Sequence, residues 1–265
     1  MLFSTYVFDM DGVLYRGDTS IPDAVSTLSQ LQSIGRRVYL LTNNSGSSRA
    51  DYAAKLARMG MNVPIDQIFT SAYATAIYLR AHGAGGKSVF IIGESGIVDE
   101  LAAMGMRPVT IPDEVPYTQI DYVVVGIDRS FTYDKLRYAH TCIDRGHAQF
   151  IATNRDATYP VENGTIPGAG SIVASVACAA GREPLVIGKP EPHALQAILD
   201  VAKSLPGETL MVGDRLDTDI AAGKRLSVPT ALVLTGVTTR EEALAAEPSL
   251  IPDRIIGSLS QLLEA

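Results

Sequence analysis

The sequence predicts an α/β protein built around a mostly parallel sheet, with a second α/β unit inserted into it. Short runs rich in β-branched and other apolar residues alternate with segments of helical apolar spacing along the chain, which is typical of βα units. The 265 residues exceed the commonest domain length, and a glycine-rich stretch, HGAGG at 82–86, interrupts the alternation. We therefore expect two domains.

The N-terminal segments predict a strand, a helix and a second strand in that order. Residues 4–9 form the first apolar run, and residues 22–34 carry apolar side chains at helical spacing. Gly35 stands where such a helix would end, and the run RRVYLLT at 36–42 has the composition of the next strand.

The segments around HGAGG determine where we expect the inserted domain. A helix beginning near Ser47 or Ser48, either of which can cap it, and a helix at about 72–82 precede the glycines. Three strands separated by helices follow the glycines, at 87–93, 121–127 and 148–154. Strands of the first domain then resume at 185–187, 209–213 and 230–234. We expect residues 84–182 to form the inserted domain, and residues 1–83 and 183–265 the domain around it.

The composition argues against several classes of function. A net charge of −7 and a pI near 5.1 argue against nucleic-acid binding, which needs clustered Lys and Arg. The four histidines fall into no zinc-ligand pattern, and we interpret Cys142 and Cys178 as buried free thiols. No apolar run approaches the ~20 residues of a membrane helix, and the first strand begins too early to leave room for a signal peptide. We expect a cytoplasmic protein without membrane partners.

Two acidic residues follow the first predicted strand, in the segment FDMDGVLYRG. Asp9 and Asp11 lie two positions apart where the strand opens into a loop, and ligands of open parallel sheets bind at this edge. Two carboxylates so close repel each other, which favours a bound cation or a proton on one of them. A solvated acidic turn would give the same local pattern.

Polar residues also follow the second strand, in the segment LLTNNS. The hydroxyl of Thr42 and the amides of Asn43 and Asn44 would lie at the same sheet edge if the strands are parallel, where such donors can bind phosphate oxygens. Taken singly, polar residues after a strand usually form only a turn.

Two further segments place charged residues after predicted strands. Lys189 follows the apolar run at 185–187, although a lone lysine is normally a solvated charge. Asp214, Asp217 and Asp219 follow the strand at 209–213, and clustered carboxylates suit an oxygen-seeking cation such as Mg²⁺. The alternative for the acidic segment is a solvent-exposed loop.

Together the four segments supply a nucleophile, an acid, a hydroxyl, a cation and a metal ligand. This ordered set, which spans nearly the whole chain, resembles the haloacid dehalogenase superfamily. The four motifs of that superfamily map onto Asp9 with Asp11, Thr42, Lys189, and Gly213 and Asp214 with Asp219. The phrases DGVLYRG, LLTNNS, TNRDATYPVENGTIPGAGS and GDRLDTDI are similar to the NagD or p-nitrophenylphosphatase-like subfamily.

The resemblance implies a Rossmann-like core with a large α/β cap and a Mg²⁺-dependent phosphatase that acts on small phosphorylated metabolites. It implies that Asp9 is the nucleophile and that Asp11 is the general acid and base. It further implies that Asp9, the Asp11 carbonyl and Asp214 hold the Mg²⁺, and that Asp219 orients Lys189 or a metal-bound water. The phosphate would be bound by Gly12, Thr42, Asn43 and Lys189. Contacts with the rest of the substrate would come from Asn44, Asn154 and Asp156. The segment 154–171 looks like the part of the cap that shapes substrate access, although a Gly/Pro-rich connection is the alternative.

Other functions remain open at this point. Dehalogenases of the superfamily lack the second aspartate and P-type ATPases replace it by threonine, so Asp11 favours phosphoester hydrolysis. A phospho-accepting signalling receiver also combines acidic residues with Thr and Lys, but receivers resemble single domains of about half this length. A ligand-binding protein with the same fold is a third possibility. The substrate stays undetermined among p-nitrophenyl phosphate, sugar phosphates, nucleotides, phosphoglycolate and pyridoxal phosphate. Caps of this family can contribute to a homodimer.

Overall fold

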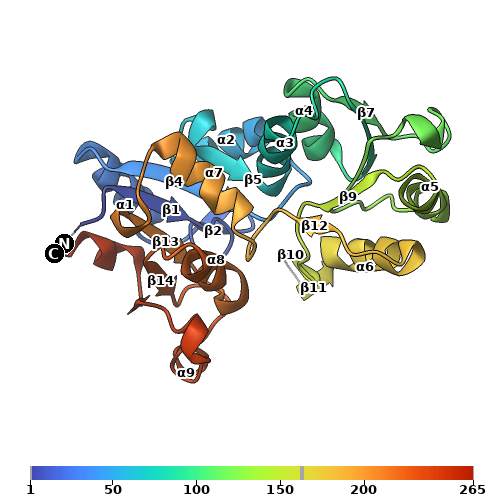
Figure 1. Cartoon of the computed structure of the whole chain (residues 1–265). Coiled ribbons are helices and arrows are strands. Elements are labelled where there is room, and N and C mark those ends of the chain that lie inside the picture. Colours follow the sequence, from blue (N-terminus) through green and yellow to red (C-terminus); the bar gives the residue numbers. More distant parts are fainter. Residues whose placement is uncertain (1, 162–163, 265) are drawn as a thin grey trace. The chain divides into compact units, whose positions relative to one another are not determined.

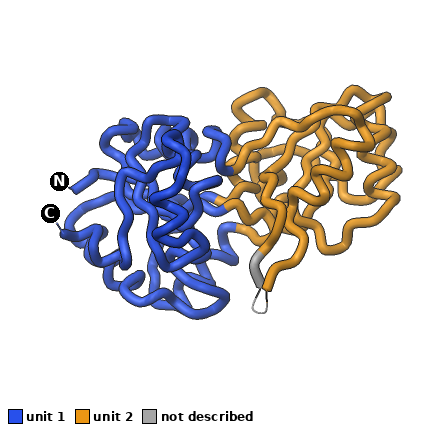
Figure 2. Tube along the Cα trace, turned by 90° about the horizontal axis from the view of Figure 1, so that it is seen from below, with its two compact units in different colours: residues 1–42, 49–69, 189–265 blue, residues 43–48, 70–188 orange. Residues whose placement is uncertain are grey.

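The computed structural model describes residues 2–161 and 164–264, and the chain divides into two compact units (Figure 2). Unit 1 comprises Met1–Thr42, Arg49–Phe69 and Lys189–Ala265, and unit 2 comprises Asn43–Ser48 and Thr70–Gly188. Unit 2 thus begins before and ends after the segment 84–182 that we expected, because the helix α3 (Ser71–Ala81) packs against α4 (Ser95–Ala103) of the same unit.

The sheet of unit 1 places β1 near its middle (Figure 1). The strand order is β15 (Arg254–Ile256), β14 (Thr230–Val233), β13 (Thr209–Gly213), β1 (Thr5–Phe8), β4 (Arg37–Thr42) and β5 (Ile68–Thr70). β1 pairs in parallel with both neighbours, so that Phe8 lies opposite Val212 on one side and Leu40 on the other. Adjacent parallel strands end at the same edge, which brings the segments after β1, β4 and β13 together.

Helices cover this sheet, which is why its central strands are continuous apolar runs. Both α1 and α7 pack against β4, and Tyr6, Phe8, Leu40 and Val212 belong to one buried core. The helices of unit 1 are α1 (Ala24–Ser33), α2 (Arg49–Arg58), α7 (His193–Ala202), α8 (Ala221–Arg225) and α9 (Arg240–Leu244). Shorter turns are the 3-10 segments Ile65–Gln67, Pro206–Glu208, Pro248–Leu250 and Leu259–Leu263 and the π-helical turn Leu216–Ile220.

Unit 2 has its own parallel sheet. The strand order is β12 (Leu185–Val186), β9 (Gln149–Ala152), β8 (Tyr122–Val125), β6 (Ser88–Ile92) and β7 (Arg107–Val109). Besides α3 and α4, the unit contains α5 (Tyr133–Asp144), α6 (Ala169–Ala180) and a 3-10 turn at Tyr117–Gln119. Phe90 of β6 meets Tyr138 of α5 edge to face, with ring centroids 4.7 Å apart, inside a separate buried core. The expected α/β fold with parallel sheets is therefore confirmed.

The main departure from the sequence-based expectation concerns the strand at 185–187. We expected it to rejoin the sheet of the first domain, but β12 pairs with β9 of unit 2, with Leu185 opposite Ile151 and Val186 opposite Ala152. That expectation was wrong because an apolar strand pattern does not specify its partner, and the chain leaves unit 2 only after this last strand.

Smaller elements also differ from the expected ones. The segment 154–171 contains an antiparallel hairpin of β10 (Thr158–Val161) and β11 (Gly164–Pro167), although two of its positions, 162 and 163, lie outside the described residues. A second hairpin, β2 (Tyr15–Arg16) with β3 (Thr19–Ser20), follows β1 where we expected only a turn. Cys142 is buried as expected, but Cys178 is exposed. No helix in the described part of the chain combines the length and the apolar character that a bilayer-spanning segment needs.

Candidate active site

The side chains after β1, β4 and β13 lie at one edge of the unit 1 sheet. Asp9 follows β1, Thr42 is the last residue of β4, and Asp214 follows β13. All three are buried. The parallel order of these neighbouring strands is what brings together residues that lie more than 200 positions apart in the sequence.

Lys189 lies within this group of acidic side chains and is almost completely buried. Its Nζ lies 2.6 Å from Oδ1 of Asp9, 2.6 Å from Oδ1 of Asp219 and 3.1 Å from the carbonyl oxygen of Leu41. Burial by itself would lower the pKa of the ammonium group, but the carboxylates of Asp219 and Asp9 outweigh it and raise the pKa of Lys189 above its usual value. The lysine is therefore a fixed positive charge in the site.

Three carboxylates share this single ammonium group. Oxygen atoms of Asp9, Asp214 and Asp219 all lie within 4.8 Å of one another. Burial raises the pKa of Asp9 well above its usual range, and the neighbouring Asp219 and Asp214 add to the rise while Lys189 opposes it. Burial and then Asp219 raise the pKa of Asp214 to about 7. The cluster thus holds more negative charge than Lys189 neutralises, and an added cation would relieve the repulsion.

Asp214 has the surroundings expected of a metal ligand. Its Oδ2 accepts the backbone N–H of Val237 at 2.7 Å, whereas Oδ1 is buried and has no hydrogen-bond partner within the described ranges 2–161 and 164–264. A buried carboxylate oxygen without a donor is costly, and a bound cation removes that cost. The donor set and this free oxygen therefore fit Mg²⁺.

Asp219 holds Lys189 and the backbone after β13 in place. Its Oδ1 contacts Lys189, and its Oδ2 accepts the N–H groups of Asp214 and Arg215 at 3.2 and 3.1 Å. Asp217 takes no part in the cluster, because it is exposed and its carboxylate binds the Arg215 guanidinium at 2.8 and 3.0 Å. These two aspartates lie only two positions apart but have different surroundings.

Asp11 and Gly12 lie in the tight turn that follows Asp9. The Met10 carbonyl accepts the N–H of Leu14 at 2.8 Å, and Gly12 adopts a φ of 80° that favours glycine. Partial burial raises the pKa of Asp11, while Lys55 and then Arg16 lower it. A raised pKa suits a group that must carry a proton to a leaving group near neutral pH.

The asparagines after β4 and the residues after β9 form a second set, in unit 2. Asn43 Nδ2 donates to Asp156 Oδ1 at 3.1 Å, and Asn44 Nδ2 donates to the hydroxyl of Tyr159 at 2.9 Å. The Oδ1 of Asn154 accepts the Thr153 hydroxyl at 3.0 Å. The structure therefore brings Asn43 into contact with another predicted site residue, Asp156, and Asn44 into contact with β10.

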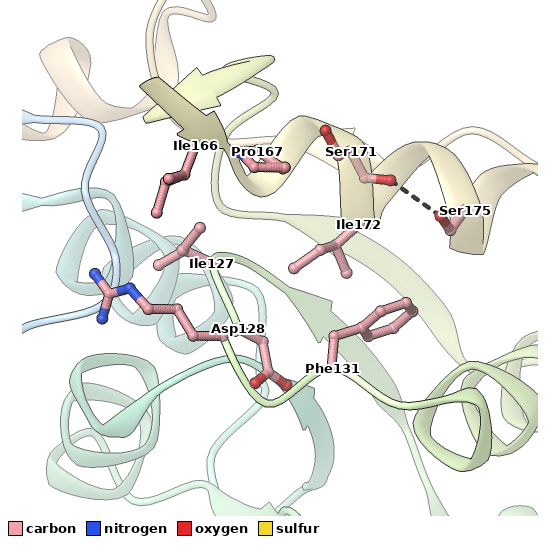
Figure 3. Close-up of a pocket in the computed structure, with 9 residues that line it drawn as sticks. Ile127, Asp128, Phe131, Ile166, Pro167, Ser171, Ile172 and Ser175 are labelled. Atoms are coloured by element: carbon pink, nitrogen blue, oxygen red, sulfur yellow. Dashed lines mark hydrogen bonds between the residues drawn. The ribbon is translucent and has the colours of Figure 1, made fainter. Parts of the chain in front are cut away.

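A pocket in unit 2 contains none of the predicted site residues (Figure 3). Its volume is about 350 Å³. Its lining consists of Ile127, Asp128, Arg129, Phe131, Ile166, Pro167, Ser171, Ile172 and Ser175. Figure 3 shows the isoleucines and Phe131 turned toward a common space, while Asp128 points away from it. The Asp128 carboxylate accepts a hydrogen bond from Lys135 at 2.7 Å. The hollow is therefore mainly apolar and offers no chemistry comparable with the acidic cluster.

Sequence reasoning missed the loop after β14, which we call the β14 loop and define as residues 234–239. It contributes Thr235, Gly236 and Val237 to the surroundings of Asp214 and Gly12. The signal that could have found it is positional: β14 neighbours β13, so the segment TG after TALVL ends at the same sheet edge.

Comparisons with known proteins show the family to which the chain is similar. A family model described as haloacid dehalogenase-like hydrolase matches residues 6–107, and a second, HAD-hydrolase-like, matches residues 186–262. Mouse chronophin is 37% identical over 97% of the chain and 91% of its own length. The structure of a p-nitrophenyl phosphatase from Archaeoglobus fulgidus is 34% identical, covers 100% of this chain and 99% of that one, and gives a TM-score of 0.90. A glycerol phosphate phosphatase from Mycobacterium tuberculosis in complex with magnesium is 34% identical over 98% of this chain and 76% of that one, with a TM-score of 0.89.

Proposed function

Since the chain belongs to the haloacid dehalogenase-like hydrolase family, we propose that it is a Mg²⁺-dependent phosphatase that hydrolyses small phosphomonoesters through an aspartyl-phosphate on Asp9. The observation that carries this proposal is the buried cluster in which Lys189 contacts Asp9 and Asp219 while Oδ1 of Asp214 lacks a donor among the described residues. Both of the similar solved structures named above are phosphatases, which supports the same class of reaction.

Asp9 and Asp11 act in both steps of the proposed reaction. A carboxylate oxygen of Asp9 attacks phosphorus, the bond from phosphorus to the leaving oxygen breaks, and Asp11 gives that oxygen its proton. Water then attacks the aspartyl-phosphate and passes a proton back to Asp11, which restores both residues. The raised pKa of Asp11 supports this assignment, because the group must be protonated at the start of each cycle.

The remaining residues bind the anionic phosphate and reduce its repulsion from the Asp9 carboxylate. Lys189 and Thr42 would bind the phosphate oxygens, assisted by Gly12 and Asn43. Asp219 orients Lys189 through the 2.6 Å contact. Mg²⁺, when bound by Asp9, the Asp11 carbonyl and Asp214, would screen the repulsion between the Asp9 carboxylate and the anionic phosphate.

We also propose that unit 1 is the catalytic domain and that unit 2 is the cap, which selects the leaving group. Asp9, Lys189, Asp214 and Asp219 all belong to unit 1, which supports the first half of this assignment. Asn44, Asn154 and Asp156 belong to unit 2 and are our candidates for contacts with the leaving group. A panel of small phosphorylated metabolites, each tested under the same conditions, would identify the preferred substrate, and a sedimentation measurement would determine the oligomeric state.

Metal removal provides the first test of the proposed reaction. We expect steady turnover of p-nitrophenyl phosphate with Mg²⁺, near-complete loss of turnover in excess EDTA and recovery when Mg²⁺ is restored, because the unrelieved carboxylate cluster repels a phosphate dianion. The measurement is release of p-nitrophenol over many turnovers. A signalling receiver would instead take up phosphate in a single turnover and then stop, and unchanged hydrolysis in EDTA would contradict the metal requirement.

Asp214→Asn tests the metal site by stability as well as by activity. We expect this variant to be more stable than the wild type in EDTA, by roughly 0.5–2 kcal/mol, because one of three crowded buried charges is removed. Mg²⁺ should raise the melting temperature of the wild type but not that of the variant, and the variant should lose turnover. Thermal melts with and without Mg²⁺ check the stabilities, and release of p-nitrophenol checks the turnover. Equal stabilisation of both proteins by Mg²⁺ would show that Asp214 is not a ligand.

A further inference from the structure

We propose that the β14 loop is a positioning element for the metal site: it holds one oxygen of Asp214 and leaves the other to ligate the cation. This inference rests on the proposed function, because it assumes that Asp214 binds Mg²⁺. Gly236 and Thr235 are the positioning residues. Neither lies in the four motif segments that contain Asp9, Thr42, Lys189 and Asp214.

The loop holds Asp214 through two backbone N–H groups. The N–H of Val237 donates to Oδ2 of Asp214 at 2.7 Å, and the N–H of Thr238 donates to the main-chain carbonyl of Asp214 at 3.1 Å. One bond fixes the carboxylate and the other fixes the backbone that carries it. Because Oδ2 already has a donor, the buried Oδ1, which has none among the described residues, is the oxygen left for a cation.

Two glycines lie against the Asp214 side chain and make this arrangement possible. A Cβ atom added at Gly236 would lie 1.9 Å from Oδ2 of Asp214 and 2.3 Å from its Cγ. A Cβ atom added at Gly12 would lie 2.6 Å from the same Oδ2. Any side chain at Gly236 would therefore displace the carboxylate. At Gly236 it is this close approach to Asp214, and not the backbone angle, that requires glycine.

The same loop reaches the turn that follows Asp9. The hydroxyl of Thr235 donates to the carbonyl of Gly12 at 2.8 Å, and the carbonyl of Thr235 accepts a hydrogen bond from the Arg16 guanidinium. β13 lies between β14 and β1 in the sheet, so the loop after β14 passes Asp214 to reach this turn. It thereby fixes the spacing between two segments that both supply proposed metal ligands.

Gly236→Ala tests the proposal, with Gly207→Ala as its matched control. A Cβ atom at Gly207 would meet nothing within 4 Å, and this glycine lies in the exposed turn Pro206–Glu208. We expect Gly236→Ala to bind Mn²⁺, a surrogate for Mg²⁺, about 10- to 100-fold more weakly than Gly207→Ala. Electron paramagnetic resonance of free Mn²⁺ in metal-stripped protein measures this affinity directly, and competition with Mg²⁺ extends it to the proposed cofactor.

Kinetic measurements should also show that Gly236→Ala affects metal binding and not the chemical step. At saturating Mg²⁺ we expect most of kcat to return in Gly236→Ala, with little change in KM for p-nitrophenyl phosphate, because the substitution alters the metal ligand and leaves Asp9 and Lys189 in place. Equal Mn²⁺ affinity of the two alanine variants would overturn the proposal. So would a kcat that stays low when the metal is saturating.

Thr235 provides a second, milder test in case Gly236→Ala fails to fold. Thr235→Val removes the hydroxyl donor to Gly12 and keeps the shape, so we expect metal affinity to fall roughly five-fold, and Thr235→Ser should restore it. A serine variant as weak as the valine variant would contradict the role of the hydrogen bond. If the wild type neither bound Mn²⁺ nor hydrolysed p-nitrophenyl phosphate, the proposed function would fail. If the wild type did both while every loop variant matched the control, only the present inference would fail.

Discussion

Asp9→Asn is expected to lower kcat for p-nitrophenyl phosphate by on the order of 10⁴-fold or more, because the amide cannot form the aspartyl-phosphate. The fold should survive, since Lys189 keeps its 2.6 Å contact with Asp219 and one of the crowded carboxylate charges disappears. The measurement is steady-state turnover together with a thermal melt. The two readouts separate loss of chemistry from loss of structure.

Asp217→Asn is the matched control for this substitution. Asp217 is an exposed aspartate that pairs with Arg215 and takes no part in the buried cluster, so an amide there should leave turnover close to that of the wild type. Trapping experiments with a phosphorylated substrate should label the wild type on Asp9 and leave Asp9→Asn unlabelled. Turnover of Asp9→Asn at the wild-type rate would rule out the covalent mechanism.

Lys189→Met is expected to produce the largest loss of stability, about 3–5 kcal/mol, together with a fall in kcat of roughly 10²- to 10³-fold. The substitution leaves Asp9 and Asp219 buried beside each other without the cation that both contact at 2.6 Å. It also removes a positive charge from the site where phosphate oxygens would bind. Denaturant unfolding measures the first effect and turnover measures the second.

Two further variants identify the cause of that loss. Lys87→Met removes an exposed lysine that lies 3.0 Å from Asp121, and a surface pair of this kind contributes only about 0–1 kcal/mol. The double variant Lys189→Met with Asp219→Asn removes both members of one buried pair, while the asparagine oxygen can still accept backbone N–H groups. We expect it to regain part of the lost stability but none of the lost activity. A double variant less stable than Lys189→Met would contradict the electrostatic explanation.

Much of the acidic cluster of this phosphatase was predictable from the sequence. Asp9, Thr42 and Asp214 each follow an apolar run, and the rule that parallel strands end at one edge was enough to expect them close together. Lys189 was predicted with the others, and the resemblance implied that Asp219 orients it, yet its 2.6 Å contact with Asp9 was not predicted, because a strand pattern does not reveal which charges a side chain will meet. The strand pattern by itself also did not distinguish Asp219 from the exposed Asp217.

Local sequence patterns did not predict the pairing of β12 or the role of the β14 loop. The run at 185–187 has the composition of a buried strand, but such a pattern does not specify the neighbouring strand. In the structure this run, β12, pairs with β9 at the edge of the unit 2 sheet. Residues 234–239 contain no ionisable side chain and no motif, so their role near Asp214 follows only from the neighbouring positions of β13 and β14.

The sequence by itself predicted the chemistry that we propose for this protein, because Asp9, Asp11, Thr42, Lys189 and Asp214 could be recognised by residue type and by their positions at the ends of predicted strands. Only the tertiary structure decided how charge is distributed among them. Burial, the shared contacts of Lys189 and the hydrogen bond from Val237 to Asp214 arise from distances between segments far apart in the chain. Local residue patterns carry the identities of such groups but not the distances between them, and electrostatic energies depend on distance and burial.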